Sequence, residues 1–284
     1  MCLIGLALDA HPHWRLVVAA NRDEYHDRPT ALLDWWRSGV DTPWLLGGRD
    51  LSAGGTWMAV SEDGRFGALT NVRDPQRQRA DASSRGALLT HWLDRGEWPP
   101  AACRTNPYNL IGGDVRSGHW FWTSDRHAEP TPLVPGVHAL SNGALDEPWP
   151  KVRRLSDALQ RALSVSTDAG TLASRLFALL DDRTEADDAE LPDTGIGRDT
   201  ERQLSPAFIH LPERGYGTRC SSVLLGSVDA VGRWRLQWLE RTHDRHGRTS
   251  AVREAVLARW PVDRSRPEVI ERRLNAAAAP SPGA

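Results

Sequence analysis

The beginning of the chain constrains the fold more than any other segment. An apolar run at residues 3–8 follows Cys2 directly, and a turn around Pro12 separates it from a second apolar run at residues 16–20. Short apolar runs on either side of a turn are typical of paired, buried β-strands. Such a hairpin fixes Cys2 at one end of a sheet and places the polar residues 21–24 where the second strand ends. We therefore expect a functional site at that end.

The rest of the chain continues with strands, then helices, then strands, without a clear linker. This order predicts mainly antiparallel sheets with helices packed outside them. Further strands are expected at residues 56–60, 66–70, 108–111, 119–123, 137–140, 222–226 and 234–239, and helices at 86–93, 151–163, 171–180 and 250–260. Residues 181–190 are strongly acidic and predict an exposed loop, whereas the alanine- and proline-rich end of 264–284 predicts disorder.

Composition excludes several classes of function. The net charge of −2 gives no reason to expect nucleic acid or an anionic membrane as a partner. Three cysteines without CxxC spacing argue against a disulfide framework and against a metal site. No apolar stretch approaches the ~20 residues of a membrane span, and no signal peptide is evident. We therefore expect a cytoplasmic protein without a transmembrane segment.

Two residue types are used unevenly. Nearly all the positive charge is arginine, and Lys151 is the only lysine, which we attribute to codon bias in a GC-rich genome. The chain also has 13 tryptophans. Most are interpreted as core residues, and the alternative is that some line a pocket for a flat or greasy ligand.

Cys2 is the strongest candidate for covalent chemistry. A small side chain at position 2 permits removal of Met1, which would make Cys2 the amino terminus. The freed α-amine, with a reference pKa of ~7.7–8.0, can then accept the thiol proton. A neighbouring Arg22 would raise the thiolate fraction. The alternatives are an accidental cysteine on a buried strand and, for residues 21–24, a solvated turn.

Cys2 and Asn21-Arg22-Asp23-Glu24 together resemble the signature of the NRDE family, the transport and Golgi organisation protein 2-like proteins. Further matching motifs follow in order. They are Arg28-Pro29, Gly47-Gly48-Arg49-Asp50, Gly54-Gly55-Thr56-Trp57, Leu69-Thr70-Asn71-Val72-Arg73, Ser84-Arg85-Gly86, Tyr108-Asn109-Leu110, Leu140-Ser141-Asn142-Gly143, Trp149-Pro150-Lys151 and Tyr216-Gly217-Thr218-Arg219. The match predicts one domain over residues 1–241 and a C-terminal extension over 242–284.

The resemblance implies a fold and a set of site residues. The family is similar to the N-terminal nucleophile (Ntn) hydrolases of the bile-salt hydrolase and penicillin V acylase type, which implies an α+β, four-layer αββα sandwich. Carried over, Cys2 is the nucleophile and Arg22 and Asp23 are the orienting charges. The remaining catalytic candidates are Asn71 and Asn142 for the oxyanion hole and Arg219 as a late supporting arginine. The candidate ligand-binding residues are Asn21, Glu24, Arg49 and Trp57.

One departure from those hydrolases leaves an alternative open. Their aspartate falls three residues after the arginine, whereas Asp23 follows Arg22 immediately. Adjacent residues of an extended segment point to opposite sides. The alternative is that the segment is a structural clamp or a ligand site.

Two functions fit the resemblance. One is the binding or trafficking of haem or of acyl-CoA and other lipid-like ligands, which requires no cofactor and treats haem as a transient, non-covalent ligand. The other is a Cys2-dependent hydrolase of amides or thioesters, or an acyltransferase.

Weaker candidates lie elsewhere in the chain. His243 and His246 are interpreted as solvated residues rather than as a metal pair. Cys220 is interpreted as a neutral replacement beside Arg219, with a reactive thiol as the alternative, and Cys103 as a packing residue.

Overall fold

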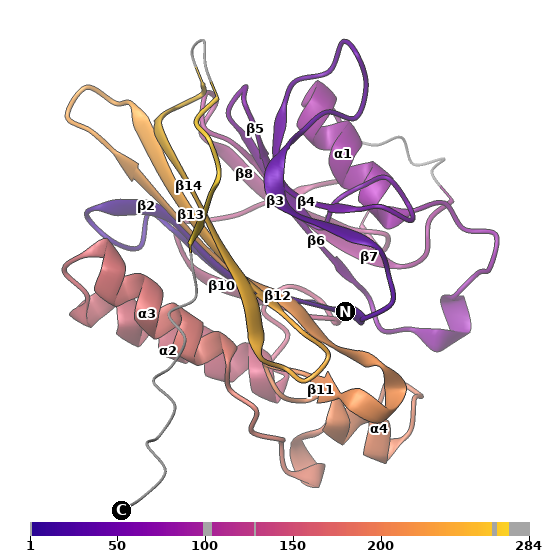
Figure 1. Ribbon diagram of the computed structural model, residues 1–284. Coiled ribbons are helices and arrows are strands. Elements are labelled where there is room, and N and C mark those ends of the chain that lie inside the picture. The colour runs from indigo at the N-terminus through magenta and orange to yellow at the C-terminus, as the bar shows by residue number, and fades with distance from the viewer. Residues whose placement is uncertain (1, 99–103, 128, 263–265, 273–284) are drawn as a thin grey trace, which may run out of the picture.

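Two antiparallel sheets stacked face to face form the centre of the computed structural model, which describes residues 2–98, 104–127, 129–262 and 266–272 (Figure 1). The first sheet has the order β10-β1-β2-β12-β13-β14-β15, with β11 paired to β12. The second sheet follows chain order from β3 to β9. The first sheet is therefore the one that contains the N-terminal hairpin.

The bounds of the elements are as follows. The strands of the first sheet are β1 (Cys2–Leu8), β2 (Trp14–Tyr25), β10 (Gly136–Leu140), β11 (His210–Leu211), β12 (Tyr216–Val228), β13 (Trp234–His243), β14 (Thr249–Trp260) and β15 (Ile270–Arg272). Those of the second sheet are β3 (Thr30–Trp36), β4 (Leu45–Asp50), β5 (Met58–Ser61), β6 (Arg65–Asn71), β7 (Tyr108–Asp114), β8 (His119–Ser124) and β9 (Thr131–Pro132). The helices are α1 (Arg85–Arg95), α2 (Pro150–Val165), α3 (Ala169–Leu180) and α4 (Arg198–Gln203), with short 3₁₀ turns at Pro75–Arg77, Asp188–Glu190 and Pro212–Arg214.

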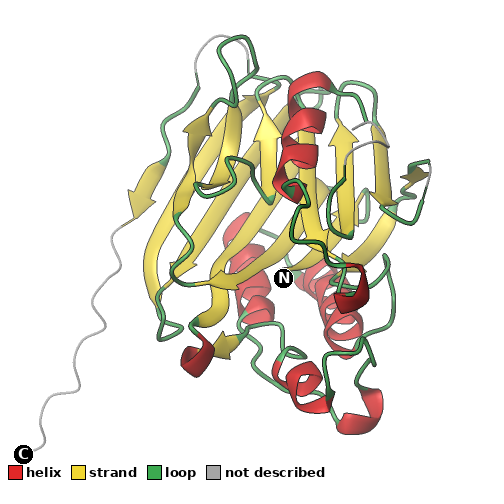
Figure 2. Ribbon diagram, turned by 90° about the vertical axis from the view of Figure 1, so that its right-hand side faces the viewer, coloured by secondary structure: helices red, strands yellow, loops and turns green. Residues whose placement is uncertain are grey.

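Helices cover both outer faces of the paired sheets. α2 and α3 pack on the first sheet against β1, β2, β10 and β12, whereas α1 packs on the second sheet against β5, β6 and β7. Figure 2 shows α1 and the α2–α3 pair on opposite sides of the strands. The predicted α+β architecture with the layer order αββα is therefore confirmed.

Strand β1 shows why this chain forms buried layers. Ile4, Leu6 and Leu8 belong to the core between the sheets, and the intervening residues face the helices. Alternate residues of a strand point to opposite faces, so an uninterrupted apolar run suits a strand covered on both sides. A glycine at position 5 lets α2 pack closely, because a Cβ there would lie only 3.1–3.2 Å from side-chain carbons of Leu155 and Leu159. The hairpin is thus held between the second sheet and α2.

Glu240 is a buried acid that joins the two sheets. One of its carboxylate oxygens accepts a hydrogen bond from the backbone N–H of Leu33 in the second sheet, at 3.1 Å. The other accepts from the Ser222 hydroxyl in the first sheet, at 2.8 Å. Only 2% of Glu240 is exposed, and burial raises the pKa of its carboxyl group. The contact fixes the two sheets relative to each other near the end of β2.

The structure corrects three expectations for the C-terminal part of the chain. Residues 250–260, predicted as a helix, lie in strand β14, which pairs with β13 and places Ala255, Leu257 and Trp260 in the core. Strand β14 lies within residues 242–284. Part of the tail also forms β15, whereas 264–265 and 273–284 lie outside the described residues.

His243 is the third correction, because it is buried rather than solvated. Its Nε2 lies 3.0 Å from the Ser221 hydroxyl, and burial lowers its pKa to about 4. His246 is exposed, as expected. The two histidines thus have different environments and do not form a pair.

Replacing Glu240 tests the link between the sheets. Glu240→Ala leaves the Leu33 N–H and the Ser222 hydroxyl without their partner, and each unpaired buried group costs ~1–3 kcal/mol. Glu240→Gln keeps both contacts within reach and should cost less. Urea unfolding of both variants, with the exposed Glu213→Ala as a control, measures the difference. An equal loss in the alanine and glutamine variants would contradict this role.

Candidate functional site

The pairing of β1 with β2 brings Cys2 and Arg22 together. The two residues are directly opposite each other in the antiparallel register. Directly opposed residues have side chains on the same face of a sheet. The next strand, β12, places Cys220 on the other side of Arg22. Arg22 thus lies between two cysteines, on the face that is turned toward the second sheet.

Arg22 is almost fully buried and is held by the second sheet. Its guanidinium lies over the Trp57 ring at 4.3 Å and donates to the Thr30 hydroxyl at 3.3 Å. The carboxylate of Glu24 is 3.9 Å away. Trp57 can lie there because a Cβ at Gly48 would overlap its ring. The packing of Trp57 beneath Arg22 therefore explains the glycine at position 48.

Asp23 and Asn21 point to the opposite face of the first sheet. Asp23 is 1% exposed and accepts a hydrogen bond from the Thr218 hydroxyl at 2.7 Å. The amide nitrogen of Asn21 donates to the carbonyl oxygens of Leu180 and Ala207, at 2.7 and 2.8 Å. Strand alternation within the four-residue motif thus sends Arg22 and Glu24 toward the second sheet and Asn21 and Asp23 toward the helices.

Asp23 nevertheless contacts Cys2 through its backbone. The Asp23 N–H is hydrogen-bonded to the Cys2 thiol. Burial has the largest effect on the pKa of this thiol and raises it, and the charge of Asp23 also raises it. The charge of Arg22 and the Asp23 N–H lower it. The balance is a thiol whose pKa lies above the ordinary value. A nucleophilic role for Cys2 would therefore require a base.

A polar cavity of about 360 Å³ lies beside Cys2, and we call it the thiol cavity. It lies between the two sheets and the loop that leads into α1. Its lining includes Cys2, Arg22, Asp23, Glu24, Arg28, Asp50, Trp57, Asn71 and Arg85. Six of these nine residues are among the ten that the sequence motifs indicated for catalysis or for ligand binding.

Asn71 and Asn142 occupy different positions in this site. Asn71 lines the thiol cavity, whereas Asn142 lies behind it and donates its amide N–H to the Asn71 carbonyl oxygen at 2.8 Å. The neighbouring Ser141 hydroxyl donates to the carbonyl oxygen of Cys2 at 3.2 Å. The Ser141-Asn142 pair at the end of β10 thus fixes both Cys2 and Asn71.

Besides Asn142, three predicted site residues lie outside the lining of the thiol cavity. Arg49 stacks over Trp36 at 4.7 Å and donates to the carbonyl oxygen of Gly54 at 3.1 Å. Arg219, at a bulge in β12, donates to the Tyr25 and Arg28 carbonyl oxygens. Asn21 is a third such residue, as its contacts above show.

Three basic residues of this region have no predicted role. Arg28 and Arg85 line the thiol cavity. Lys151 is 3% exposed and lies close enough to Cys2 and Asp23 for both to influence its titration. The available signal was their position inside matching motifs. Cys220 is buried with a raised pKa, and Cys103 lies outside the described residues.

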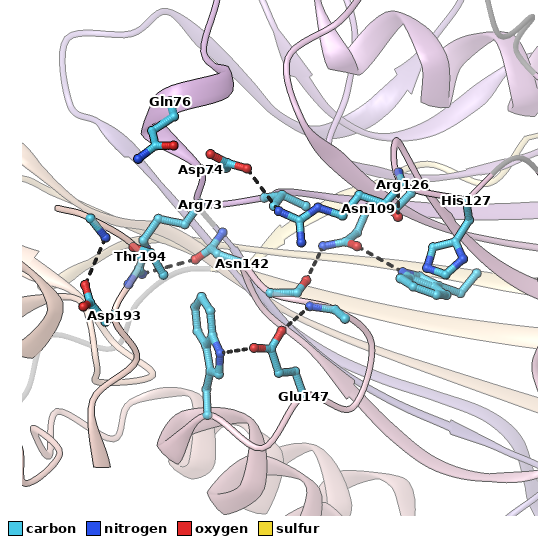
Figure 3. Close-up of a pocket in the computed structure, with 17 residues that line it drawn as sticks. Arg73, Asp74, Gln76, Asn109, Arg126, His127, Asn142, Glu147, Asp193 and Thr194 are labelled. Carbon is cyan, nitrogen blue, oxygen red and sulfur yellow. Dashed lines mark hydrogen bonds and ion pairs between the residues drawn. The ribbon is translucent and has the colours of Figure 1, made fainter. Parts of the chain in front are cut away.

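A second cavity adjoins the thiol cavity, and a third adjoins the second. The second, of about 430 Å³, shares Glu24, Asn71 and Arg85 with the thiol cavity, and we call it the apolar cavity. It is also lined by Val72, Pro75, Ile196, Leu204, Leu211 and Tyr216. The third, of about 510 Å³, is drawn in Figure 3, where Arg73, Asn109 and Asn142 surround it and Arg126 is paired with Asp74.

Among residues 2–98, 104–127, 129–262 and 266–272, no group of three or more histidine, cysteine, aspartate or glutamate side chains is arranged to hold a metal ion. No helix in the same ranges has both the length and the apolar character needed to cross a membrane.

The fold and the site define an αββα protein with a cysteine-lined cavity at the start of its first strand. The model of the Transport and Golgi organisation 2 family matches residues 1–245, and the chain belongs to this family. It is 33% identical over 260 residues to the Transport and Golgi organization protein 2 homolog of Homo sapiens, covering 82% of this chain and 90% of that one. The Mus musculus homolog is 31% identical with the same coverage.

Two solved structures are similar at lower identity. One is the C2A mutant of the conjugated bile acid hydrolase from Clostridium perfringens, with 10% identity, a TM-score of 0.45 and coverage of 96% of this chain and 97% of that one. The other is an N-acylethanolamine-hydrolyzing acid amidase ortholog from Caenorhabditis elegans, with 12% identity, a TM-score of 0.40 and coverage of 62% and 85%.

Replacing Arg22 tests its influence on the thiol. Arg22→Met keeps a long side chain over Trp57 but removes the charge that lowers the Cys2 pKa. The thiolate fraction falls about tenfold for each unit by which the pKa rises, so iodoacetamide should modify Cys2 severalfold more slowly at pH 8. Peptide mapping separates Cys2 from the other cysteines, and Arg49→Met is the matched control. An unchanged rate in Arg22→Met would contradict the contact.

Proposed function

We propose that this protein binds an acyl amide or thioester in the thiol cavity and that Cys2 attacks its carbonyl carbon. The observation that carries the proposal is the position of the Cys2 thiol, which lines a cavity together with Arg22 and receives the Asp23 N–H. A nucleophile held by neighbouring groups and open to a cavity is the arrangement that covalent acyl transfer requires. The class is a cysteine-dependent hydrolase or acyltransferase.

The first step needs a base, because burial keeps the Cys2 thiol protonated. Removal of Met1 would free the α-amine of Cys2, whose reference pKa of ~7.7–8.0 suits it to accept the thiol proton. The sulfur then forms a bond to the carbonyl carbon, and the carbonyl oxygen becomes an oxyanion. When the tetrahedral intermediate collapses, the bond to the leaving amine or thiol breaks and the α-ammonium returns the proton. Water or an acceptor releases the acyl group from Cys2.

Asn71 is the proposed donor to the oxyanion. It lines the same cavity as Cys2, and the amide of Asn142 holds its backbone at 2.8 Å. A donor fixed before the reaction stabilises developing charge without the cost of reorganisation. In this scheme Asn142 acts through Asn71 and positions it, while Arg22 stabilises the thiolate.

The apolar cavity accommodates the acyl chain. It shares Asn71 and Arg85 with the thiol cavity, so a chain lying along Ile196 and Leu211 would extend directly from a carbonyl at Cys2. Arg28 and Arg85 are suited to the anionic part of the ligand, such as the phosphates of an acyl-CoA. The apolar lining of one cavity and the arginines of the other together favour a long-chain acyl compound with a charged or polar head.

Acyl turnover by a Cys2 variant tests the proposal. Wild type, Cys2→Ala and Cys220→Ala would be incubated with a panel of long-chain acyl-CoA esters and fatty acyl amides. An electrophilic acyl probe would be added in parallel. We expect hydrolysis to fall to background only in Cys2→Ala, and one probe molecule to attach per wild-type chain, at Cys2. Undiminished turnover in Cys2→Ala would refute the proposal.

Haem is the second candidate ligand. A thiolate can serve as an axial ligand to haem iron, and arginines pair with carboxylates such as propionates. Cys2, Arg28 and Arg85 bring both groups to one cavity. Haem would be held by these groups without covalent attachment, and it would supply a metal centre ligated by sulfur. Tryptophan adds little support, because among the described residues only Trp57 of that type lines this cavity.

A haem titration distinguishes this candidate from the first. If Cys2 ligates the iron, wild type should bind haem saturably and change its Soret band. Cys2→Ala should abolish that spectral change. Tryptophan quenching follows the same titration, and acyl-CoA serves as the competing ligand. Absence of saturable binding would remove haem as a candidate.

A further inference from the structure

Lys151 is a buried cation on the helix side of the Cys2 site. It lies in the first turn of α2, after Trp149 and Pro150, and only 3% of it is exposed. Its ammonium group donates to the carbonyl oxygen of Leu204 at 2.9 Å. Lysine is among the residues that are almost never fully buried without a partner. A buried ammonium of this kind requires compensation by nearby acceptors or negative charge.

The segment that receives Lys151 also contacts the partner of Asp23. The Ile209 N–H, five residues after Leu204, donates to the Thr218 hydroxyl at 2.8 Å, and that hydroxyl donates to Asp23 at 2.7 Å. Residues 204–209 are thus bonded to Lys151 at one end and to the Thr218–Asp23 pair at the other. Lys151 and Asp23 belong to one buried polar cluster behind the thiol cavity.

The charged groups that act on Lys151 come from β1, β2, α4 and the loop after β6. The pKa of Lys151 is lowered to about 8, chiefly by burial and next by the guanidinium of Arg73. Asp23 on β2, Cys2 on β1 and Glu201 on α4 act in the opposite direction. Arg73 and Glu201 form an ion pair with each other. Asp23 is therefore the first carboxylate that Lys151 can balance.

The effect is reciprocal at Asp23. Burial raises the pKa of this carboxyl group, and the charge of Lys151 lowers it. Arg22 also lowers it, although its side chain lies on the other face of the sheet. The only lysine of the chain occupies this position, among 35 basic residues. A lysine is compact and titratable when buried, whereas an arginine remains charged.

We propose that Lys151 is a positioning residue of the Cys2 site, whose ammonium group keeps the Asp23 carboxylate ionised behind the thiol. The charge of Asp23 in turn acts on Cys2, and its backbone N–H contacts the thiol. Lys151 thereby influences the reacting sulfur without touching the ligand. This inference deepens the acyl-transfer function proposed above and rests on it for its purpose, but its test does not depend on turnover.

Nuclear magnetic resonance of the single lysine provides that test. The full chain is prepared with lysine labelled with ¹³C at Cε, so that one side-chain resonance reports the titration of Lys151. In wild type we expect a midpoint near the pKa of about 8. In Asp23→Asn the counter-charge is lost, and the midpoint should fall by about one unit or more.

Matched variants separate the proposed coupling from a merely structural role. Asp23→Glu keeps the charge and should hold the midpoint near the wild-type value. Asp157→Asn removes an exposed carboxylate from the same helix and should leave the midpoint unchanged. If Lys151 only satisfies the Leu204 carbonyl oxygen, Asp23→Asn will titrate like wild type. That result overturns the proposal, whether or not the protein turns over acyl compounds.

Should Asp23→Asn not fold, Lys151→Met supplies the decisive measurement. Without the ammonium group, the folded-state pKa of Asp23 rises further above its unfolded value. A carboxyl group whose pKa is higher in the folded than in the unfolded state destabilises the fold at a pH above that folded-state pKa. The destabilisation is lost as the pH falls and the group takes up a proton. The difference in urea midpoint between wild type and Lys151→Met should therefore narrow from pH 7 to pH 5. A difference that stays constant over this range overturns the proposal.

Discussion

The pairing of Cys2 with Arg22 across β1 and β2 is the contact on which the site depends. It is set by the register of a hairpin that is apolar on both faces. A shift of that register by one residue would turn every side chain of the shifted strand to the opposite face of the sheet. Both faces of this hairpin are covered, one by the second sheet and the other by the helices. Such a shift would therefore bury polar side chains against apolar ones. The fold thus fixes the thiol and the guanidinium on one face of the first sheet.

The motif Asn21-Arg22-Asp23-Glu24 serves both faces of the sheet, which reconciles two interpretations that the sequence left open. Arg22 and Glu24 point toward the thiol cavity. Asn21 instead donates hydrogen bonds to Leu180 at the end of α3 and to Ala207 in the loop before β11. Asp23 belongs to the helix side but contacts the thiol through its backbone. The segment is therefore both a structural clamp and a part of the cavity.

The pattern of apolar residues predicted elements that are determined by residues near them in the sequence. It missed elements that depend on pairing with distant segments. The hairpin and α2 follow from apolar periodicity alone. Residues 250–260 contain alanine, arginine and glutamate, which favour a helix. They nevertheless form a strand, because they pair with the edge of β13. Lys151 shows the same limit for the site, since its partners lie on β1, β2 and α4. No sequence spacing indicates that contact.

Intact-mass spectrometry of the purified full chain tests the central claim most directly. The proposed mechanism requires Cys2 to be the amino terminus, because its half-buried thiol has a raised pKa and needs the adjacent α-amine as a base. It predicts a mass that lacks one methionine and an amino-terminal peptide that begins at Cys2. A chain that retains Met1 in full would have no α-amine on the nucleophile, and it would contradict the proposed mechanism.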